Sequence, residues 1–597
     1  MIKNWILPFE KKEAPVGNEF ANLHPVALRL LAFRGIEDAE AVRKFFKPNW
    51  ETDIHDPFLF SQMGAAVERV FMALIKGEHI TVHGDYDADG VSGSAIVIQT
   101  LREIQKKINE SQNLIQNTSD EIRDTPDKIQ DSVIDYYIPH RDKEGYGLHV
   151  ETVEELTRRG TNLLITVDCG IASTPEISLA RTLGMDVLVL DHHQYNETLP
   201  DAILVHPKLP NETYDFPHLA AVGVAWKFAS ALIEYAREKG VQIKIGWEKW
   251  LLDLVSIATV TDMVPLIGEN RTLEFFGLKV LNKTPRPGLV KLMAIAGLRP
   301  GSITSESVAF AIGPRLNAAG RMDHASLALE LLLAEDDSQA ELFAKQLEEL
   351  NKMRQKTTAK MMDEAKEKLN PDDNSSVLIL WSEDWSPALV GLVAGRFLDI
   401  TGKPTVAIGK FGDRWVGSGR SISVYNITEA VTVAGDGLLT HVGGHVQACG
   451  FSFVNDESLL KLVSNLKEHA ALSLLSQDLS PTIQIDAEIG LADLNWNLIE
   501  SLDLFEPYGE GNKRPFFMTR DLEVMVCEKV GSSMNHLRCL LESKDGMRQK
   551  FMGFNLASKF EWLNVGDRVD VVYHVGVNEW NGRRDIQCKI VDMKLSS

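Results

Sequence analysis

The sequence predicts an α/β protein whose larger part is a parallel sheet covered by helices on both faces, followed by a smaller α/β domain and a β domain. Three observations predict it. Short apolar runs alternate with helical periodicity between residues 76 and 193. A long helical pattern over about 325–370 leads to a second strand–loop–helix unit. From about residue 480 the pattern changes to the period-two alternation of exposed β-strands.

The elements follow in order from a mostly helical lead-in over residues 1–75. The predicted strands of the first sheet lie in "HITVHGD" (79–85), "VIDYYIP" (133–139), "NLLITVDCG" (162–170) and "MDVLVLDHH" (185–193). The polar segment 103–133 is expected to be an exposed helical or disordered insertion outside the core. The domain boundaries that this pattern predicts are 1–75, 76–330, 331–374, 375–478 and 479–597.

In the last three segments, specific residues mark where helices and turns begin or end. Segment 331–374 is a long connecting helix that should stop at Asn370-Pro371. In the smaller α/β domain, Ser386-Pro387 predicts a helix start. An Asn581-Gly582 pair predicts a hairpin in the C-terminal domain, which we expect to be a small β-barrel.

Length and composition limit the possible functions. The chain of 597 residues is too long for one core, and its 44% hydrophobic content is that of an ordinary globular protein. We find no apolar run that would span a bilayer and no signal-peptide core, and the five cysteines form no CxxC pair, so a cytoplasmic location is expected. The net charge of −22 argues against a general nucleic-acid coat but allows a local basic channel.

Acidic residues and histidines follow three of the predicted strands directly. They are Asp85, Asp87 and Asp89, then Asp168, and then the run Asp191, His192 and His193. The carboxyl ends of parallel strands meet at one edge of the sheet, where so many carboxylates would repel one another unless cations bind. Mixed carboxylate and imidazole ligands suit manganese, and magnesium is possible. Two such ions about 3.5–4 Å apart are the arrangement that hydrolyses phosphate esters.

Each of these motifs alone has an ordinary alternative. A lone DxDxD is as often a solvated loop or a single calcium or magnesium loop, and VDCG alone is most often a turn at a strand end. Their occurrence together, each after a strand, favours a metal centre.

The motifs "HGDYDADG", "VDCG" and "DHH", in that order, resemble the DHH phosphoesterase superfamily. Longer matches resemble its bacterial single-stranded-DNA-specific exonucleases. These matches are "YYIPHRDKEGYG" (136–147), "TVTDMVPL" (259–266), "GPRLNAAGRM" (313–322), "GSGRS" (417–421), "GGHVQACGF" (443–451) and "FEPYGEGNKRPFF" (505–517). The resemblance implies a DHH catalytic domain, a DHHA-type substrate-binding domain and a C-terminal barrel of the oligonucleotide-binding (OB) type.

The resemblance also implies roles for the acidic and histidine residues. His83, Asp87 and Asp168 would bind one ion, and Asp89, His192, Asp262 and again Asp168 would bind the second, so that Asp168 bridges them. Asp85 and Asp191 would orient these ligands. His193 would contact the scissile phosphate or donate a proton. From the sequence alone, Asp262 could equally be a helix-capping or buried, hydrogen-bonded aspartate.

The substrate contacts come from other motifs. Arg141 and Tyr146 offer a cation and an aromatic ring on one loop, although a surface turn would explain them too. The resemblance implies that Arg315 and Arg321 hold the DNA. A phosphate cradle is predicted at Ser418, Arg420, Ser421 and His445, where a glycine hairpin and a strand-end turn are the alternatives.

Two further groups are weaker candidates. On the connecting helix, the side chains of Lys352, Arg354, Lys356 and Lys360 could follow a nucleic-acid backbone or form a solvated face. In the barrel, Phe551, Phe554 and Tyr573 could stack on bases, with core packing as the default.

The function predicted is a metal-dependent exonuclease that degrades single-stranded DNA to mononucleotides, in DNA repair and recombination. Two-metal hydrolysis follows from the residues, whereas the 5′-to-3′ polarity and the DNA substrate are implied by the resemblance. The alternatives are a phosphoesterase or pyrophosphatase for small substrates, and a catalytically inactive nucleic-acid-binding scaffold. The resemblance also implies a single-strand-binding protein and a helicase as partners, and we expect a monomer without a membrane contact.

Overall fold

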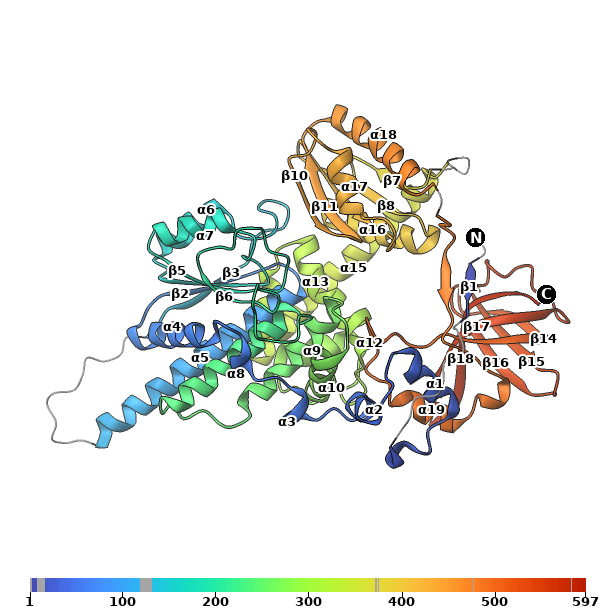
Figure 1. Cartoon of the computed structure of the whole chain (residues 1–597), viewed down its shortest axis with the longest axis horizontal. Coiled ribbons are helices and arrows are strands. Elements are labelled where there is room, and N and C mark those ends of the chain that lie inside the picture. The colour runs from blue at the N-terminus through green and yellow to red at the C-terminus, as the bar shows by residue number, and fades with distance from the viewer. Residues whose placement is uncertain are drawn as a thin grey trace.

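A computed structural model of the chain describes residues 3–7, 17–118, 131–370, 373, 375–475, 477–580 and 582–596. Figure 1 shows a larger α/β body on the left, a smaller α/β body above it and a β-barrel on the right. These are called the parallel-sheet domain (residues 50–333), the smaller α/β domain (residues 377–474) and the barrel domain (residues 482–596). The predicted fold class is confirmed.

The parallel-sheet domain is built on five strands. Their spatial order is β3 (Ile134–Tyr137), β2 (Ile80–Gly84), β4 (Leu163–Val167), β5 (Asp186–Leu190) and β6 (Ile203–Val205), all parallel. One face is covered by α4 (Met63–Lys76), α5 (Ala88–Thr118) and α8 (Ala221–Glu238), the other by α6 (Val150–Arg159) and α7 (Thr174–Thr182). Successive strand residues enter opposite cores: Ile165 and Leu188 face the first group of helices, Leu164 and Val187 the second.

Further helices complete this domain. They are α3 (Trp50–Asp53), α9 (Leu252–Thr261), α10 (Gly268–Leu281), α11 (Pro287–Ile295), α12 (Ser305–Ser307), α13 (Gly313–Met322) and α14 (Ser326–Leu333), with 3₁₀ turns at Pro57–Leu59 and Trp247–Leu251 and a π-helix at Val308–Ile312. The segment 103–133, expected outside the core, differs from that expectation. Its first turns continue α5 and bury Ile104 and Ile108 in the core, while 119–130 lie outside the described residues.

Helix α15 (Asp337–Glu367) joins the two α/β domains. Asp336 caps its first turn by accepting hydrogen bonds from the amides of Ser338 and Gln339, each at 2.9 Å. Pro371, predicted to stop this helix, lies outside the described residues.

The smaller α/β domain has a mixed sheet. Its order is β10 (His441–His445), β11 (Ala448–Phe453), β9 (Arg414–Arg420), β8 (Thr405–Phe411) and β7 (Leu378–Trp381), and only β7 and β8 pair in parallel. Helix α16 (Pro387–Thr401) starts where predicted, and its Phe397 shares a core with Met362 of α15. Helices α17 (Ile427–Ala434) and α18 (Asp456–Ser473) cover the other face.

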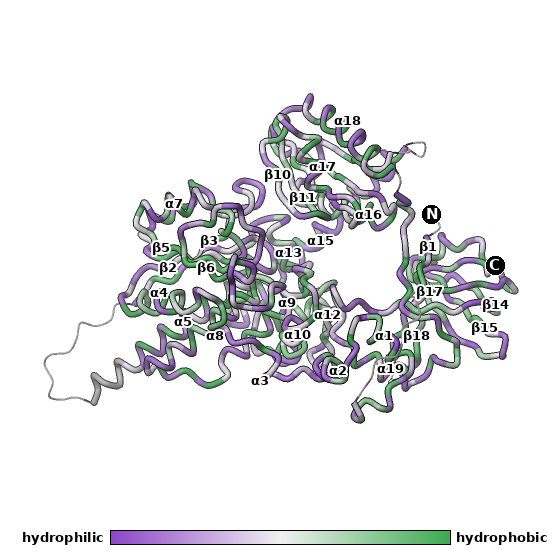
Figure 2. Tube along the Cα trace, in the orientation of Figure 1, coloured by the Kyte–Doolittle hydropathy of each residue, from purple (hydrophilic) through white to green (hydrophobic). Residues whose placement is uncertain are grey.

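The barrel domain closes because β14 pairs on both sides. The ring of strands is β14 (Phe517–Val530), β15 (His536–Glu542), β16 (Arg548–Gly553), β18 (Arg583–Leu595) and β17 (Arg568–Trp580), which pairs with β14 again. Figure 2 shows hydrophobic and hydrophilic residues interleaved along these strands. Phe551 and Tyr573 are fully buried in the barrel, as core packing requires, and cannot stack on bases, whereas Phe554 is 47% exposed. Asn581 of the predicted hairpin lies outside the described residues.

The predicted lead-in divides between two cores. Helices α1 (Pro25–Phe33) and α2 (Ala39–Phe46) pack with α19 (Trp496–Asp503) in the barrel core, whereas α4 belongs to the parallel-sheet domain. Three short strands and two 3₁₀ turns complete the element list: β1 (Asn4–Ile6), which pairs with β12 (Thr482–Gln484), β13 (Ala487–Glu488), Asn18–Phe20 and Leu491–Asp493. The first and last parts of the chain therefore form one unit.

Within the described ranges, no single helix has the length and apolar character needed to cross a membrane. One bent pair, Trp50–Leu59 with Met63–Lys76, meets that test of length and composition only when the two are taken together.

Candidate metal centre

The loop between β2 and α5 carries the first group of acidic residues. His83, near the end of β2, is fully buried, and Asp85 is 3% exposed. Asp87 caps α5 because its Oδ1 accepts hydrogen bonds from the amides of Asp89 at 2.8 Å and Gly90 at 3.3 Å. Gly90 packs directly on the backbone of Asp85, where a Cβ would lie 2.6 Å from the amide nitrogen. A larger residue at position 90 would therefore displace the loop.

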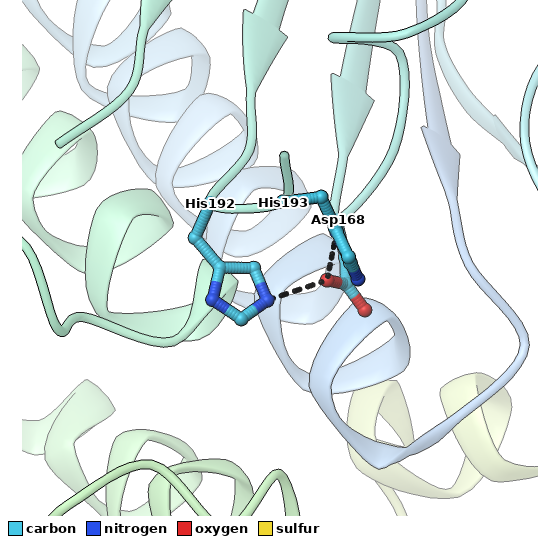
Figure 3. Close-up of side chains that lie close together, drawn as sticks. All are labelled: Asp168, His192 and His193. Atoms are coloured by element: carbon cyan, nitrogen blue, oxygen red, sulfur yellow. Dashed lines mark ion pairs between the residues drawn. The ribbon is translucent and has the colours of Figure 1, made fainter. Parts of the chain in front are cut away.

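Asp168 follows β4 in a left-handed conformation with φ of 64°. Its side chain is almost fully buried, and its Oδ1 lies 3.5 Å from Nε2 of His192 and 3.7 Å from Nδ1 of His193 (Figure 3). The Tyr146 hydroxyl donates to the backbone carbonyl of Asp168 at 3.0 Å, which fixes the turn.

Asp191 contacts the two histidines that follow it. Its Oδ1 accepts from the amides of His192 at 2.7 Å and His193 at 3.1 Å and lies 2.8 Å from the His193 ring Nδ1. Its Oδ2 accepts from the amide of Ile171 at 3.1 Å. The acceptors of Asp191 are therefore used within this loop, while its role in orienting metal ligands stays a prediction.

Helices α8 and α9 complete the centre. Both carboxylate oxygens of Asp89 accept hydrogen bonds at 2.8 Å, from the amides of Ala221 and Val222 at the start of α8. Asp262 ends α9, and its Oδ2 lies 3.7 Å from Nε2 of His192. The same Nε2 is 3.9 Å from Oδ2 of Asp89.

These atoms form three groups in which the ligand atoms lie within 4.8 Å of one another. The groups are Asp89 with His192 and Asp262, Asp85 with Asp87 and Asp168, and Asp168 with His192 and His193. Nε2 of His83, Oδ1 of Asp85, Oδ1 of Asp168 and Nε2 of His192 are buried and have no hydrogen-bond partner among the described residues. Buried polar atoms without partners are unfavourable, so this donor set fits divalent cations.

The structure differs from the sequence prediction in two respects. Asp85, expected only to orient other ligands, lies among the potential ligands beside Asp87 and Asp168. His83, expected to be a ligand, is outside these groups, and its Nδ1 lies 3.4 Å from the sulfur of Cys169 while its Nε2 has no partner.

Burial and mutual repulsion shift the pKa values of the carboxyl groups strongly. Burial, then the charges of neighbouring aspartates, raise the pKa of Asp85, Asp168 and Asp262 well above their ordinary values. The same causes raise the pKa of Asp89 to about 7. Burial lowers the pKa of His192 to about 3, so its imidazole is neutral and can act as a ligand.

These shifts predict how pH affects the metal-free protein. In the unfolded chain these carboxyl groups release their protons near pH 4, whereas in the folded protein they keep them to higher pH. The stabilisation that comes from binding these protons is therefore complete below about pH 4 and is lost as pH rises through the folded pKa values. Divalent cations replace these protons. We therefore expect Mn²⁺ to raise Tm by several degrees more at pH 8 than at pH 6, measured by thermal melts in Mn²⁺ and in EDTA. Equal increases at both pH values would contradict this origin of the stabilisation.

Five arginines extend from the centre toward the smaller α/β domain. This arginine cluster consists of Arg141, Arg321, Arg354, Arg396 and Arg420, each of which lies close enough to another member for their charges to interact. Burial and then the charges of Arg141 and Arg354 lower the pKa of Arg321 to about 9, and burial and then Arg396 lower the pKa of Arg354. None of the five pairs with a carboxylate in the part of the chain that the structure describes. Clustered cations without counter-ions favour an anionic ligand.

Two members of the cluster hold positions next to the centre. Arg141 lies over the ring of Tyr86, 4.7 Å from its centroid. Arg321 donates to the carbonyl of Ala388 at 2.8 Å, which links α13 to the first turn of α16.

Other predicted substrate residues have partners inside the protein. Arg315 pairs with Glu348 at 2.7 Å, Arg420 donates to Oγ of Ser418 at 2.9 Å, and buried Ser421 donates to the carbonyl of Tyr425 at 2.7 Å. On α15, Lys352 pairs with Glu349 and Lys360 with Glu364.

Tyr146 and His445 both lie near His193. The Tyr146 hydroxyl is 3.1 Å from Nδ1 of His193, and its ring meets that of His193 edge to face. Burial and then the charges of His193 and Lys208 lower the pKa of His445, which lies at the end of β10 in the smaller α/β domain.

The sequence analysis missed the contribution of β6. This short strand is followed by His206 and Lys208, and Lys208 donates to the carbonyl of His192 at 2.6 Å. The apolar run at 202–205 followed by His-Pro-Lys was the available signal, of the same kind as the other strand ends.

Comparisons with known proteins identify each domain. The DHH family N-terminal domain matches residues 79–259, the DHHA1 domain residues 374–471 and the RecJ OB domain residues 485–592. The single-stranded-DNA-specific exonuclease RecJ of Bacillus subtilis is 33% identical over 582 residues, covering 97% of this chain and 69% of that protein. RecJ of Salmonella typhimurium is 31% identical over 593 residues, covering 96% of each chain.

The fold also matches a solved structure. The crystal structure of RecJ in complex with Mn²⁺ from Thermus thermophilus has a TM-score of 0.79 and 25% identity, covering 100% of this chain and 80% of that one.

Proposed function

This chain belongs to the RecJ family of single-stranded-DNA-specific exonucleases, and from this premise we propose that it hydrolyses single-stranded DNA to mononucleotides from the 5′ end, using two divalent cations. The observation that supports this most strongly is the set of buried, unpartnered ligand atoms at the carboxyl edge of the parallel sheet. Its relatives are named as exonucleases of this specificity, and the similar Thermus structure contains Mn²⁺.

Two residue sets would hold the ions, Mn²⁺ or Mg²⁺. Asp89, His192 and Asp262 form one, and Asp85 and Asp87 form the other, to which we add His83 because its buried Nε2 has no partner among the described residues. Asp168 would serve both, because its Oδ1 lies 3.5 Å from Nε2 of His192 and its carboxylate also shares a group with Asp85 and Asp87. When bound, the ions supply Lewis-acid activation of water and neutralise charge on the phosphate.

His193 is the residue best placed to move a proton. Burial lowers its pKa, but the hydrogen bond to Asp191 and the charges of Asp191, Asp85 and Asp87 together outweigh this effect, so its pKa lies above the ordinary value. At neutral pH a larger fraction of its imidazole is therefore charged than in solution. We assign His193 the role of holding the scissile phosphate and donating a proton to the leaving oxygen.

The arginine cluster would hold the phosphates of the strand. It connects the metal centre to α16 and β9, so a strand lying along it would pass between the two α/β domains. Ser418 and Arg420, with His445, would contact the terminal phosphate. Arg315 and Ser421 would act indirectly, since their polar groups are already paired. Arg315 would hold α13 against α15, and Ser421 would hold the turn that follows β9.

Arg141 provides a direct test of phosphate contact. Arg141→Ala should raise KM for single-stranded DNA about tenfold and reduce the salt dependence of binding, because a charge-assisted contact to phosphate is lost. The matched control is Arg158→Ala on α6, whose side chain is 70% exposed and already pairs with Glu155. Initial rates against DNA concentration at two salt concentrations measure both effects. An Arg141 variant with the kinetics of the Arg158 control would remove Arg141 from the binding site.

The cellular setting follows as part of the same proposal. The enzyme would act as a monomer in the cytoplasm, in DNA repair and recombination. Its substrates would be single strands that a helicase exposes and a single-strand-binding protein covers.

Digestion of oligonucleotides labelled at either end tests the proposal. Single-stranded DNA, matched duplex and RNA are incubated with the protein in Mn²⁺, Mg²⁺ or EDTA. We expect mononucleotides from the 5′ end of single-stranded DNA only, and only with a metal. Hydrolysis restricted to dinucleotides or pyrophosphate would make the protein a phosphoesterase of small substrates. Tight binding without hydrolysis would make it a scaffold.

A further inference from the structure

The segment after Asp262 connects the metal centre to the barrel domain. Met263 has a φ of 59°, and the chain then runs through Leu266 to the start of α10 at Gly268. The amide of Leu266 donates to the carbonyl of Glu510 at 2.7 Å. Glu510 belongs to the FEPYGEGN loop (residues 505–512), which lies between α19 and the first long barrel strand. A metal ligand and this loop are therefore four residues and one hydrogen bond apart.

Arg271 on α10 fixes the same loop more extensively. Its five N–H groups donate to five backbone carbonyls: Phe45 at 2.8 Å, Leu504 at 3.4 Å, Phe505 and Pro507 at 3.2 Å each, and Glu506 at 2.9 Å. The side chain is 3% exposed and forms no ion pair with any described carboxylate. Four of the five carbonyls belong to the consecutive residues 504–507, so the buried guanidinium fixes the position of this stretch of backbone.

The loop is also held on its other side and within itself. Asn512 donates to the carbonyls of Phe505 at 2.8 Å and Pro507 at 2.9 Å. Arg34 of α1 donates to Oδ1 of Asn512 at 2.9 Å and to the carbonyl of Lys513 at 2.7 Å. The loop is thus clamped between α10 of the parallel-sheet domain and the N-terminal helices that pack on the barrel.

Close packing reinforces the hydrogen bond at Leu266. A Cβ on Gly509 would lie 2.6 Å from Cδ1 of Leu266, and a Cβ on Gly511 would lie 3.0 Å from Cβ of Pro265. Leu266 itself is 1% exposed, so it has little room to move away. A displacement of the loop would therefore shift the segment that begins at Asp262.

We propose that Arg271 and the FEPYGEGN loop are a positioning device through which the docked barrel domain fixes Asp262 in the metal centre. The inference rests on the proposed function for its catalytic consequence, but its structural part concerns only this chain. Under it, the barrel domain contributes to metal binding and to kcat, in addition to any contact with DNA.

Two full-length variants with matched controls test the proposal. Arg271→Lys keeps the charge but has three donors in place of five, and its control is Arg538→Lys on β15, whose side chain is 53% exposed and pairs with Glu528. Gly509→Val places a side chain against Leu266, and its control is Gly576→Val, where a Cβ would meet nothing within 4 Å. Circular dichroism and thermal melts establish that each variant is folded.

Three readouts are measured for each variant. These are deuterium uptake of peptides covering residues 263–270 in EDTA, Mn²⁺ binding by electron paramagnetic resonance, and kcat and KM on a 5′-phosphorylated trinucleotide and on a 40-nucleotide strand. For Arg271→Lys and Gly509→Val we expect faster exchange of the Leu266 amide, at least tenfold weaker binding of one Mn²⁺, and a fall in kcat of about tenfold on both substrates. The controls should stay within twofold of the wild type.

The contrary result is equally clear. If both variants exchange and bind Mn²⁺ like the wild type, and only KM for the long strand rises, the loop merely docks the barrel and the proposal is wrong. Failure of the wild type to cleave either substrate would contradict the proposed function instead, while exchange and Mn²⁺ binding would still test the coupling.

Discussion

Asp168→Asn should reduce kcat on single-stranded DNA by at least about 10³-fold with little change in KM, because the one carboxylate placed to serve both ions is lost. Oδ1 of Asp168 lies 3.5 Å from the His192 ring nitrogen, and Asp168 also shares a ligand group with Asp85 and Asp87. Asparagine is the informative replacement because it tolerates the φ of 64° at this position. Alanine would add backbone strain to the loss of the ligand.

The matched control for this variant is Asp201→Asn, since the Asp201 side chain is 89% exposed. It should keep the wild-type rate. Initial rates of nucleotide release in saturating Mn²⁺ measure both variants. If Asp168→Asn retained a rate within tenfold of the wild type, Asp168 could not be the shared ligand.

Gly90→Ala should also abolish activity, by displacing the loop that carries the first carboxylates. A Cβ at this position would lie 2.6 Å from the amide nitrogen and 2.7 Å from both Cα and the carbonyl oxygen of Asp85. These are backbone atoms, so the contact is relieved only if the loop moves away from α5. We expect at least about a 100-fold loss of kcat and a decrease of about 1–3 kcal/mol in the free energy of unfolding.

Gly395→Ala on α16 is the matched control, because a Cβ there meets nothing within 4 Å. It should leave activity unchanged and stabilise the fold slightly, since alanine favours a helix over glycine. Urea unfolding and Mn²⁺ titration separate the two effects at position 90. A Gly90 variant that is destabilised but binds Mn²⁺ and cleaves DNA normally would show that the close contact serves folding alone.

Most residues of the metal centre that could be predicted from the sequence directly follow a predicted strand. Apolar runs followed by Asp or His predicted where β2, β4 and β5 deliver their side chains, and parallel pairing brings those ends together. Asp262 ends a helix and carries no such signal, so its place required the family resemblance. Lys208 was missed because the strand before it, β6, is only three residues long.

Interactions between distant segments could not be predicted. Arg315 looked available for DNA, yet Glu348 on α15 pairs with it from 33 positions away. Phe551 and Tyr573 lie on barrel strands whose side chains alternate between two faces. The sequence pattern alone does not show which of the two faces points into the barrel. The FEPYGEGN motif was recognised as a family feature, but its contact with Arg271 joins segments more than 230 residues apart.

The location of bound Mn²⁺ tests the central claim most directly. Crystals of the wild-type protein grown with Mn²⁺ would be measured at the manganese absorption edge, where anomalous scattering locates each ion. The account predicts two ions, one beside Asp262 and His192 and the other beside Asp85 and Asp87, both in contact with Asp168. A single ion at this edge of the sheet, or two ions that do not share Asp168, would contradict it.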